Sequence, residues 1–153
     1  MIESTVRVAR AGDEEFVLAL SPRFAETRAP WRTAAEVEAG TRRWLERVLQ
    51  RPRDDEVLLV AEDGAGSRAG FLYAYTEPDF FTREPHAHIS EIAVVEDGGG
   101  AGRALMLAAE AWARERGHTY VSLHVNARNE RGLRFYERLG YDLEWRRMNK
   151  RLR

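Results

Sequence analysis

Apolar residues alternate with polar ones in several short stretches of the chain. In the first of these, Val6 and Val8 are separated by a charged residue and flanked by polar ones, which is typical of a half-buried strand. Two short apolar runs follow later around the turn-forming sequence GAGS and predict an antiparallel hairpin. Strands are expected over residues 4–10, 56–63, 69–76, 88–96, 119–125 and 141–152, the last as a closing strand or hairpin.

Between these stretches the apolar residues recur at helical intervals. The best example begins at Thr33 and Glu36, which have the spacing of a capping box, and its apolar positions continue up to Pro52. Four helices are expected: from Gly12 to Pro22, from Thr33 to Pro52, from Arg103 to Arg116 with Gly117 as C-cap, and from Asn129 as N-cap to Gly140. Residues 21–30 and 79–88 are expected to form a loop and an irregular connection.

The element order is therefore βααβββαβαβ, with no internal repeat. Strands with hairpin connections come first and strand–helix–strand units second. This order predicts an α/β class, an α+β mixed sheet flanked by helices. A length of 153 residues predicts a single domain over 1–153.

Composition narrows the classes of function. Apolar residues make up 44% of the chain and charged residues 32%, which is ordinary for a soluble globular protein. The net charge of −1 gives no reason to expect a nucleic-acid or membrane partner. There is no cysteine, which excludes disulfides and thiolate chemistry and fits a reducing compartment, so a cytoplasmic location is expected.

Four of the chain's 12 glycines lie within residues 98–102, between a predicted strand and a predicted helix. Such a loop is either a tight turn or an anion site built from backbone N–H groups and a helix N-terminus. A nucleoside-triphosphate loop would need Gly-Lys-Ser/Thr, but Arg103 follows Gly102. A dinucleotide fingerprint fails in both reading frames, because Arg103 or Leu105 occupies the last glycine position. The loop alone leaves both interpretations open.

Two segments together resemble the GNAT (Gcn5-related N-acetyltransferase) superfamily. The first is EIAVVEDGGGAGRAL, with Gly-x-Gly-x-x-Leu at residues 100–105. The second is NERGLRFYERLGY, in which Asn129, Gly132, Phe135, Tyr136, Gly140 and Tyr141 occupy the family positions. The two segments and their connection span residues 88–141, and the joint match is far more specific than either piece.

The resemblance implies the GNAT acyl-CoA N-acyltransferase fold and acetyl-CoA as co-substrate. It assigns main-chain contacts with the pantetheine arm to Ile92, Ala93 and Val94. It assigns the pyrophosphate to a cradle formed by Gly98, Gly99, Gly100, Ala101, Gly102 and Arg103. Asn129 would contact the cofactor near its pantetheine arm, and Tyr136 would reach the sulfur and return a proton to the departing thiolate.

One departure from the family pattern lies at Glu96 and Asp97. The family has Arg or Gln at the opening of a slightly longer loop, whereas two carboxylates stand here. Carboxylates beside a pyrophosphate would repel it. We expect either that they face solvent or that affinity for the pyrophosphate depends on Arg103 and Arg128.

Transfer to an amine also requires a base, because an alkyl amine has a pKa of about 10.4. Glu91 is the first candidate and His88 the competing one, although either could instead be an ordinary strand residue with no part in the reaction. His86 and His124 have weaker cases, and the spacing of the three histidines shows no compact ligand set, so no metal is expected. Oxyanion stabilisation would come from backbone N–H groups in residues 92–94.

The sequence thus predicts an acetyl-CoA-dependent N-acetyltransferase. It is expected to act by direct transfer, because the chain has no cysteine to form an acyl-cysteine intermediate. The acceptor is a small-molecule, peptide or protein amine. Its pocket would use the aromatic residues Trp31, Phe80 and Phe81 and the acidic residues Glu77, Asp79 and Glu84. Alternatives are a non-catalytic acyl-CoA sensor and a nucleic-acid-binding domain using the basic residues 146–153. A homodimer is common for such a fold but is not determined by the sequence.

Overall fold

The computed structural model describes residues 3–153. Its elements are β1 (Thr5–Val8), α1 (Glu14–Ala19), the 3₁₀ helix η1 (Ser21–Ala25), α2 (Ala34–Gln50), β2 (Glu56–Glu62), β3 (Arg68–Pro78), β4 (Pro85–Val94), α3 (Ala101–Glu115), β5 (Val121–Leu123) and α4 (Glu130–Arg138). None of the helices in this part of the chain is long and apolar enough to cross a membrane.

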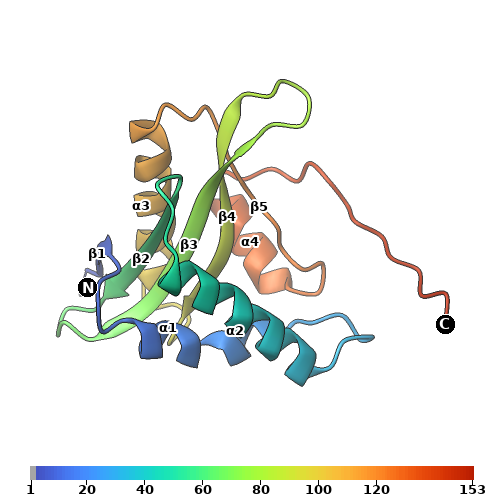
Figure 1. Ribbon diagram of the computed structural model, residues 1–153, viewed down its shortest axis with the longest axis horizontal. Coiled ribbons are helices and arrows are strands. Elements are labelled where there is room, and N and C mark those ends of the chain that lie inside the picture. Colours follow the sequence, from blue (N-terminus) through green and yellow to red (C-terminus); the bar gives the residue numbers. More distant parts are fainter. Residues whose placement is uncertain (1–2) are drawn as a thin grey trace.

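The strands form one mixed sheet in the order β1-β2-β3-β4-β5. The first three neighbouring pairs are antiparallel, while β4 and β5 are parallel and are joined through α3. Helix α3 lies on one side of the sheet and helices α1 and α2 lie on the other, as Figure 1 shows. The mixed α/β architecture predicted from the element order is confirmed.

Alternation along β2 builds two cores. Val57, Leu59 and Ala61 pack with Leu105 and other residues of α3, to which α4 adds partly buried side chains. Val60, on the opposite face, packs in a second cluster with residues of α1 and α2. Because both faces are covered, the edge of the sheet and the ends of its strands are what remain open.

A buried carboxylate fixes α1 to the sheet. The side chain of Asp13 is fully buried and accepts hydrogen bonds from Arg7 at 2.8 Å and from Arg68 at 2.7 Å. It also accepts one from the backbone N–H of Arg10. Asp13 therefore joins β1 and β3 to the start of α1, although it makes no side-chain capping bond to that helix.

Two predicted element bounds were wrong in the middle of the chain. Strand β4 begins at Pro85, not at residue 88, because β3 runs on to Pro78 and the hairpin continues through the pair Glu77–His86. The connection is closed by Asp79, whose carboxylate accepts backbone N–H groups of the following turn. In the second case η1 replaces the start of the predicted loop over residues 21–30.

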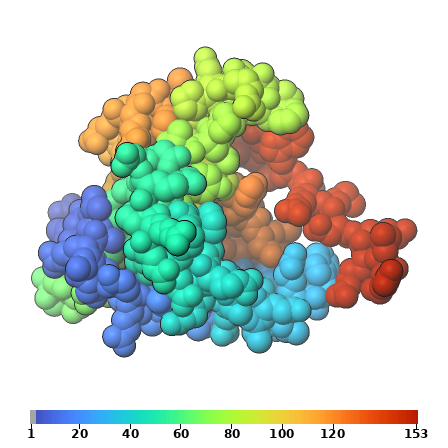
Figure 2. Space-filling model, viewed as in Figure 1, coloured from blue at the N-terminus to red at the C-terminus, as the bar shows by residue number. Residues whose placement is uncertain are grey.

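The closing strand or hairpin predicted over residues 141–152 is absent from the described chain. After α4 the chain runs as an extended arm, residues 142–153, outside the sheet and its covering helices (Figures 1 and 2), and touches the rest of the chain where Trp145 stacks on Phe81 and Arg151 donates a hydrogen bond to the carbonyl of Trp31. A strand exists only where a neighbour completes its hydrogen-bond ladder, and no described strand pairs with the arm. Its apolar side chains are 61–93% exposed, namely Leu143, Trp145, Met148 and Leu152.

Candidate active site

A bulge in β4 decides which side chains share a face of the sheet. In the pairing with β3, Glu91 lies opposite Tyr73 and Ile89 lies opposite Ala74, so Ser90 is an extra residue. Without it, His88 and Glu91 would point to opposite faces, because strand side chains alternate. With it, both lie on the face covered by α2. The sequence carries no sign of this bulge.

Beyond the bulge, β4 separates from β5. The two strands pair only over Ala87–Ile89, so the later part of β4 has no partner on its β5 side within residues 3–153. The N–H of Val95 donates to Ala69 in β3, so by alternation the N–H and C=O of Val94 and Ile92 point towards the open side. Of the three predicted main-chain contacts, Ile92 and Val94 are available there, whereas Ala93 faces β3.

The glycine loop forms the start of α3. Gly98 and Gly100 have φ angles of +83° and +86°, and Gly100 is the N-cap of the helix. No side chain caps this end of the helix. The first helical hydrogen bond runs from the N–H of Ala104 to the C=O of Gly100, so the N–H groups of residues 101–103 have no partner within the helix. Unpartnered amides and the positive end of the helix dipole make this loop a candidate anion site.

Glu96 and Asp97, the acidic pair before the glycine loop, repel an anion at this loop less than the sequence suggests. The carboxylate of Asp97 accepts hydrogen bonds from Arg23 at 3.0 Å and from Arg131 at 2.7 Å. Glu96 is exposed. Asp97 is thus offset by two guanidinium groups, neither of which belongs to Arg103 or Arg128.

The three predicted segments meet at one point. The Cα of Gly102 is so placed that a Cβ there would lie 3.7 Å from Val94 and 3.5 Å from Phe135. Strand β4, the start of α3 and helix α4 are therefore packed together. The opening between β4 and β5 and the free N-terminus of α3 belong to a single region.

Glu91 lies at the inner end of this region, under α2. One carboxylate oxygen accepts a hydrogen bond from the indole N–H of Trp44 at 3.2 Å. Burial raises the pKa of Glu91 to about 7, and the bond from Trp44 opposes that rise. Trp44 is in turn held edge-on against Tyr73 and beneath the guanidinium of Arg47. Sequence reasoning missed Trp44, which the helical pattern identified only as an apolar position.

Helix α4 carries the two predicted residues of the second motif. The side chain of Asn129 accepts a hydrogen bond from the N–H of Gly132 at 2.9 Å, as predicted for an N-cap. A side chain at position 132 would collide with it, which explains the glycine. Tyr136 packs between Phe135 and Tyr141, and burial raises its pKa. No described group hydrogen-bonds its hydroxyl.

The histidines are arranged differently from the prediction. His86 and His88 are both buried on the α2 face, and both lie near Glu77 of the neighbouring strand. Burial lowers the pKa of His88, and its Nδ1 lies 2.8 Å from Ser122 Oγ. His124 lies outside the compact set of ligand side chains, as the spacing of the three histidines suggested, but His86 and His88 form such a set with Glu77, which spacing did not predict. Spacing could not show it because Glu77 comes from another strand.

Comparison with known proteins agrees with this arrangement. The model of the Acetyltransferase (GNAT) family matches residues 21–141. The chain therefore belongs to the GNAT acetyltransferase family. The solved structure of a putative acetyl transferase from Pyrococcus furiosus has a TM-score of 0.79 at 25% identity, over 98% of this chain and 100% of that one.

Two further similarities concern more specific proteins. A mycothiol acetyltransferase from Propionibacterium freudenreichii is 34% identical over 99 residues, which are 63% of this chain and 31% of the relative. The chain thus corresponds to under a third of that relative's length. Aminoglycoside N-acetyltransferase AAC(6')-Iy, solved in complex with CoA, has a TM-score of 0.72 at 18% identity, over 100% of this chain and 97% of that one, which shows a shared fold.

Proposed function

We propose that this protein transfers the acetyl group of acetyl-CoA directly to a primary amine within a ternary complex. The observation that carries the proposal is the single region formed by the open side of β4 and the free N-terminus of α3. It offers main-chain hydrogen-bonding groups and an anion site in one continuous surface. Those are the two features that a pantetheine arm ending in a pyrophosphate requires.

The residues fit the co-substrate in the following way. The amides of residues 98–103 would bind the pyrophosphate, with Arg103 exposed beside them. Ile92 and Val94 would bind the pantetheine amides through their main chains. The Oδ1 of Asn129 accepts its capping bond, which leaves both hydrogens of its Nδ2 to donate to the arm.

Glu91 is the proposed base. A carboxyl whose pKa is about 7 is about half ionised at neutral pH and is a stronger base than an ordinary glutamate, so its carboxylate can accept a proton from the attacking ammonium, directly or through water. The amine nitrogen then forms a bond to the thioester carbon, backbone N–H groups of β4 stabilise the oxyanion, and the C–S bond breaks. Tyr136 would donate its hydroxyl proton to the thiolate, and the proton that the nitrogen loses on becoming an amide would return through water to the Tyr136 phenolate. His88 is the alternative base.

The acceptor is proposed to be a cationic amine, small or presented by a peptide. Glu77, Asp79 and Glu84 give the β3–β4 hairpin an acidic character. The exposed rings of Phe80 and Phe81 lie at its tip. Neither feature selects among small amines, peptide N-termini and lysine side chains.

The first experiment separates the enzyme from an acyl-CoA sensor. Acetyl-CoA and CoA affinities are measured by calorimetry, and thiol release is followed against a panel of amines and peptides. Binding of CoA together with turnover of at least one amine supports the proposal. Tight CoA binding with no turnover of any amine favours the sensor, and no CoA binding refutes both.

Two variants then test the assigned roles. Tyr136→Phe should lower kcat while leaving CoA affinity nearly unchanged, because only the hydroxyl is lost. Glu91→Gln should lower kcat/KM for the amine and remove the ionisation near pH 7 from its profile. Unchanged turnover in Tyr136→Phe would remove the acid role, and an unchanged profile in Glu91→Gln would transfer the base role to His88 or water.

We also propose that the chain forms a homodimer through its arm, residues 142–153. The arm exposes four large apolar side chains, and the outer edge of β5 has no described partner. Beside that edge a hollow of about 320 Å³ is lined by Ala113, Val121 and Tyr141, among others. Pairing of the arm of one copy with β5 of another would cover both. Sedimentation analysis of the full chain and of Trp145→Ser tests this; a full-length monomer at all concentrations would refute it.

A further inference from the structure

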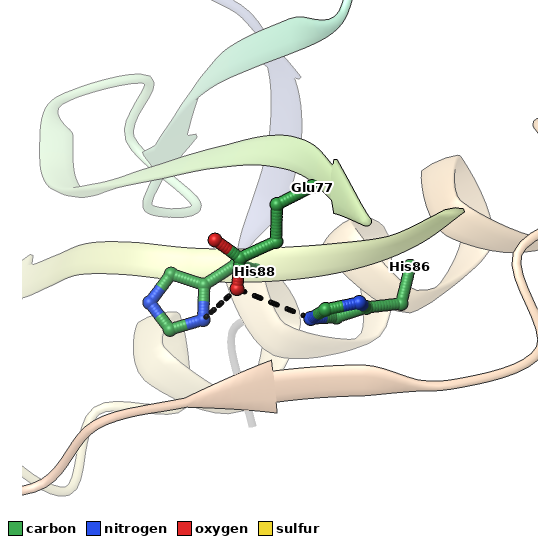
Figure 3. Close-up of side chains that lie close together, drawn as sticks. All are labelled: Glu77, His86 and His88. Atoms are coloured by element: carbon green, nitrogen blue, oxygen red, sulfur yellow. Dashed lines mark ion pairs between the residues drawn. The ribbon is translucent and has the colours of Figure 1, made fainter. Parts of the chain in front are cut away.

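We propose that Glu77, His86 and His88 form a binding site for a divalent transition-metal cation of the zinc class. One carboxylate oxygen of Glu77 lies 3.2 Å from His86 Nε2 and 3.6 Å from His88 Nδ1, and Figure 3 shows it facing both rings. All three ligand atoms lie within 4.8 Å of one another. Ligands of tetrahedral zinc, at bonds of 2.0–2.1 Å, are separated by about 3.3 Å.

The strand pairing places these residues together without any loop. Glu77 is directly opposite His86 in the antiparallel ladder, and His88 follows His86 by two positions on the same face. Both histidines are 5% exposed, so their rings are fixed by packing. A site carried by neighbouring strands is preorganised before any ion arrives.

Counting the hydrogens available for hydrogen bonds indicates that this cluster lacks a positive charge. The hydroxyl of Tyr120 has one hydrogen, which it donates to the carboxylate of Asp79. Towards His86 Nδ1, at 3.0 Å, the oxygen of Tyr120 must therefore accept. In neutral His86 the proton is then on Nδ1, and Nε2 carries a lone pair.

That lone pair points at another lone pair. His86 Nε2 and the Glu77 oxygen have no hydrogen to share at 3.2 Å, and such a contact is repulsive unless a positive charge lies between them. Ser122 Oγ lies 3.1 Å from the same nitrogen and 2.8 Å from His88 Nδ1; when neutral His88 carries its proton on Nε2, both nitrogens are acceptors and the single hydrogen of Ser122 serves only one of them. With both rings neutral in these tautomers, the cluster presents more lone pairs than protons, which is the condition of a cation site.

The donor set selects the class of ion. Two imidazole nitrogens and one carboxylate oxygen suit Zn²⁺, Co²⁺, Ni²⁺ and Cu²⁺, whereas Mg²⁺ and Ca²⁺ require mostly oxygen ligands. Tyr120 and Asp79 form the outer partners of His86 that fix its tautomer, an arrangement typical of metal-bound histidines. Glu77, with 37% of its side chain exposed, lies on the side from which an ion would enter.

The site does not include Glu91, the proposed base, although it contains His88, the alternative one. Glu91 lies opposite Tyr73 on β3, whereas His88 and His86 lie opposite Tyr75 and Glu77, so the ligand set extends from about 7 Å to about 13 Å from Glu91 along the strand. The ring of Tyr75 contacts His88. Metal binding can therefore be measured without acetyl-CoA or any acceptor, and a failure to bind metal would leave the proposed acetyl transfer unaffected.

The experiment uses tag-free full-length protein freed of metal with a chelator. Zn²⁺ is titrated by calorimetry, and Co²⁺ is added as a spectroscopic probe, because its visible d–d bands report tetrahedral coordination. The wild type should bind one equivalent of Zn²⁺. Glu77→Gln and His86→Gln should weaken binding at least about 10-fold, since removing a direct ligand costs no less than removing an outer one.

The matched control is His124→Gln. Its ring lies 4.9 Å from that of His88 but outside the ligand set, so this variant should bind Zn²⁺ like the wild type. If a variant folds poorly, the thermal shift of the wild type with Zn²⁺ against chelator gives the same answer. The proposal is overturned if wild-type protein binds no Zn²⁺ or if His124→Gln loses as much affinity for Zn²⁺ as His86→Gln. It is also overturned if nitrogen NMR of the metal-free protein finds both ring nitrogens of His86 protonated at neutral pH and the spectrum does not change when Zn²⁺ is added.

Discussion

The hydrogen bond from Trp44 to Glu91 gives a quantitative test of the proposed base. Replacing Trp44 by Phe keeps an aromatic ring against Tyr73 but removes the indole N–H that lies 3.2 Å from the carboxylate. That bond favours the ionised carboxylate, and burial favours the neutral acid. Trp44→Phe should therefore raise the pKa of Glu91 further above its ordinary value.

The size of the shift follows from the exposure of the donor. A hydrogen bond to a charged group contributes about 1.5–3 kcal/mol. Trp44 is 38% exposed, so water partly replaces it, and about 1 kcal/mol is the appropriate figure. This corresponds to about 0.7 of a pKa unit. Starting from a pKa of about 7, the ionised fraction at pH 7 falls from about one half to about one sixth, a roughly threefold loss in kcat/KM.

The assay is the pH dependence of kcat/KM for the amine in wild type and Trp44→Phe, followed by thiol release. Ionisation of the amine contributes equally to both profiles, so their difference isolates Glu91. Carboxyl carbon NMR of Glu91 reports the same pKa without any acceptor. Trp112→Phe, a Trp-to-Phe change on α3 that is far from Glu91 in the fold, is the control. An unmoved or lowered pKa in Trp44→Phe, or an equal shift in Trp112→Phe, would refute the reasoning.

Three further predictions concern the glycine loop, the core and the buried carboxylate. Gly100→Ala and Gly117→Ala each place a side chain at a positive φ, at opposite ends of α3, so each should lower the free energy of unfolding by about 1–2 kcal/mol. Only Gly100→Ala should weaken CoA binding in calorimetry. Equal CoA affinity of the two variants would contradict the anion-site assignment. Leu105→Ala, at a fully buried position, should cost about 2–5 kcal/mol in urea unfolding, whereas Leu107→Ala on the exposed side of the same helix should cost under about 1 kcal/mol. The guanidinium groups around Asp13 hold its pKa well below the ordinary value, so the stability that its carboxylate contributes is present above pH ~4 and is lost as the pH falls below that. Asp13→Asn should therefore lower the free energy of unfolding by about 3–5 kcal/mol at pH 7. A difference in stability between wild type and Asp13→Asn that failed to narrow in acid would argue against the ion pairs.

The sequence by itself determined most of the fold and the segments that form the candidate co-substrate site. Some structural features depend only on residues that are close together in the sequence. Those predicted here all appear in the structure: the capping box at Thr33 and Glu36, the alternation along β2, and the N-cap at Asn129. The glycine loop and the Asn–Tyr motif belong to the same class of signal. They depend on backbone conformation over a few residues, which composition and spacing specify.

Only the tertiary structure decided which distant side chains meet. The bulge at Ser90, which puts Glu91 on the face of His88, is a property of strand register and leaves no mark in the local sequence. The same register brings Glu77 to the two histidines. The arm has strand-like alternation but no described partner, because pairing depends on an edge supplied from elsewhere. Local patterns specify elements, whereas register, burial and partners arise only when the elements pack against each other.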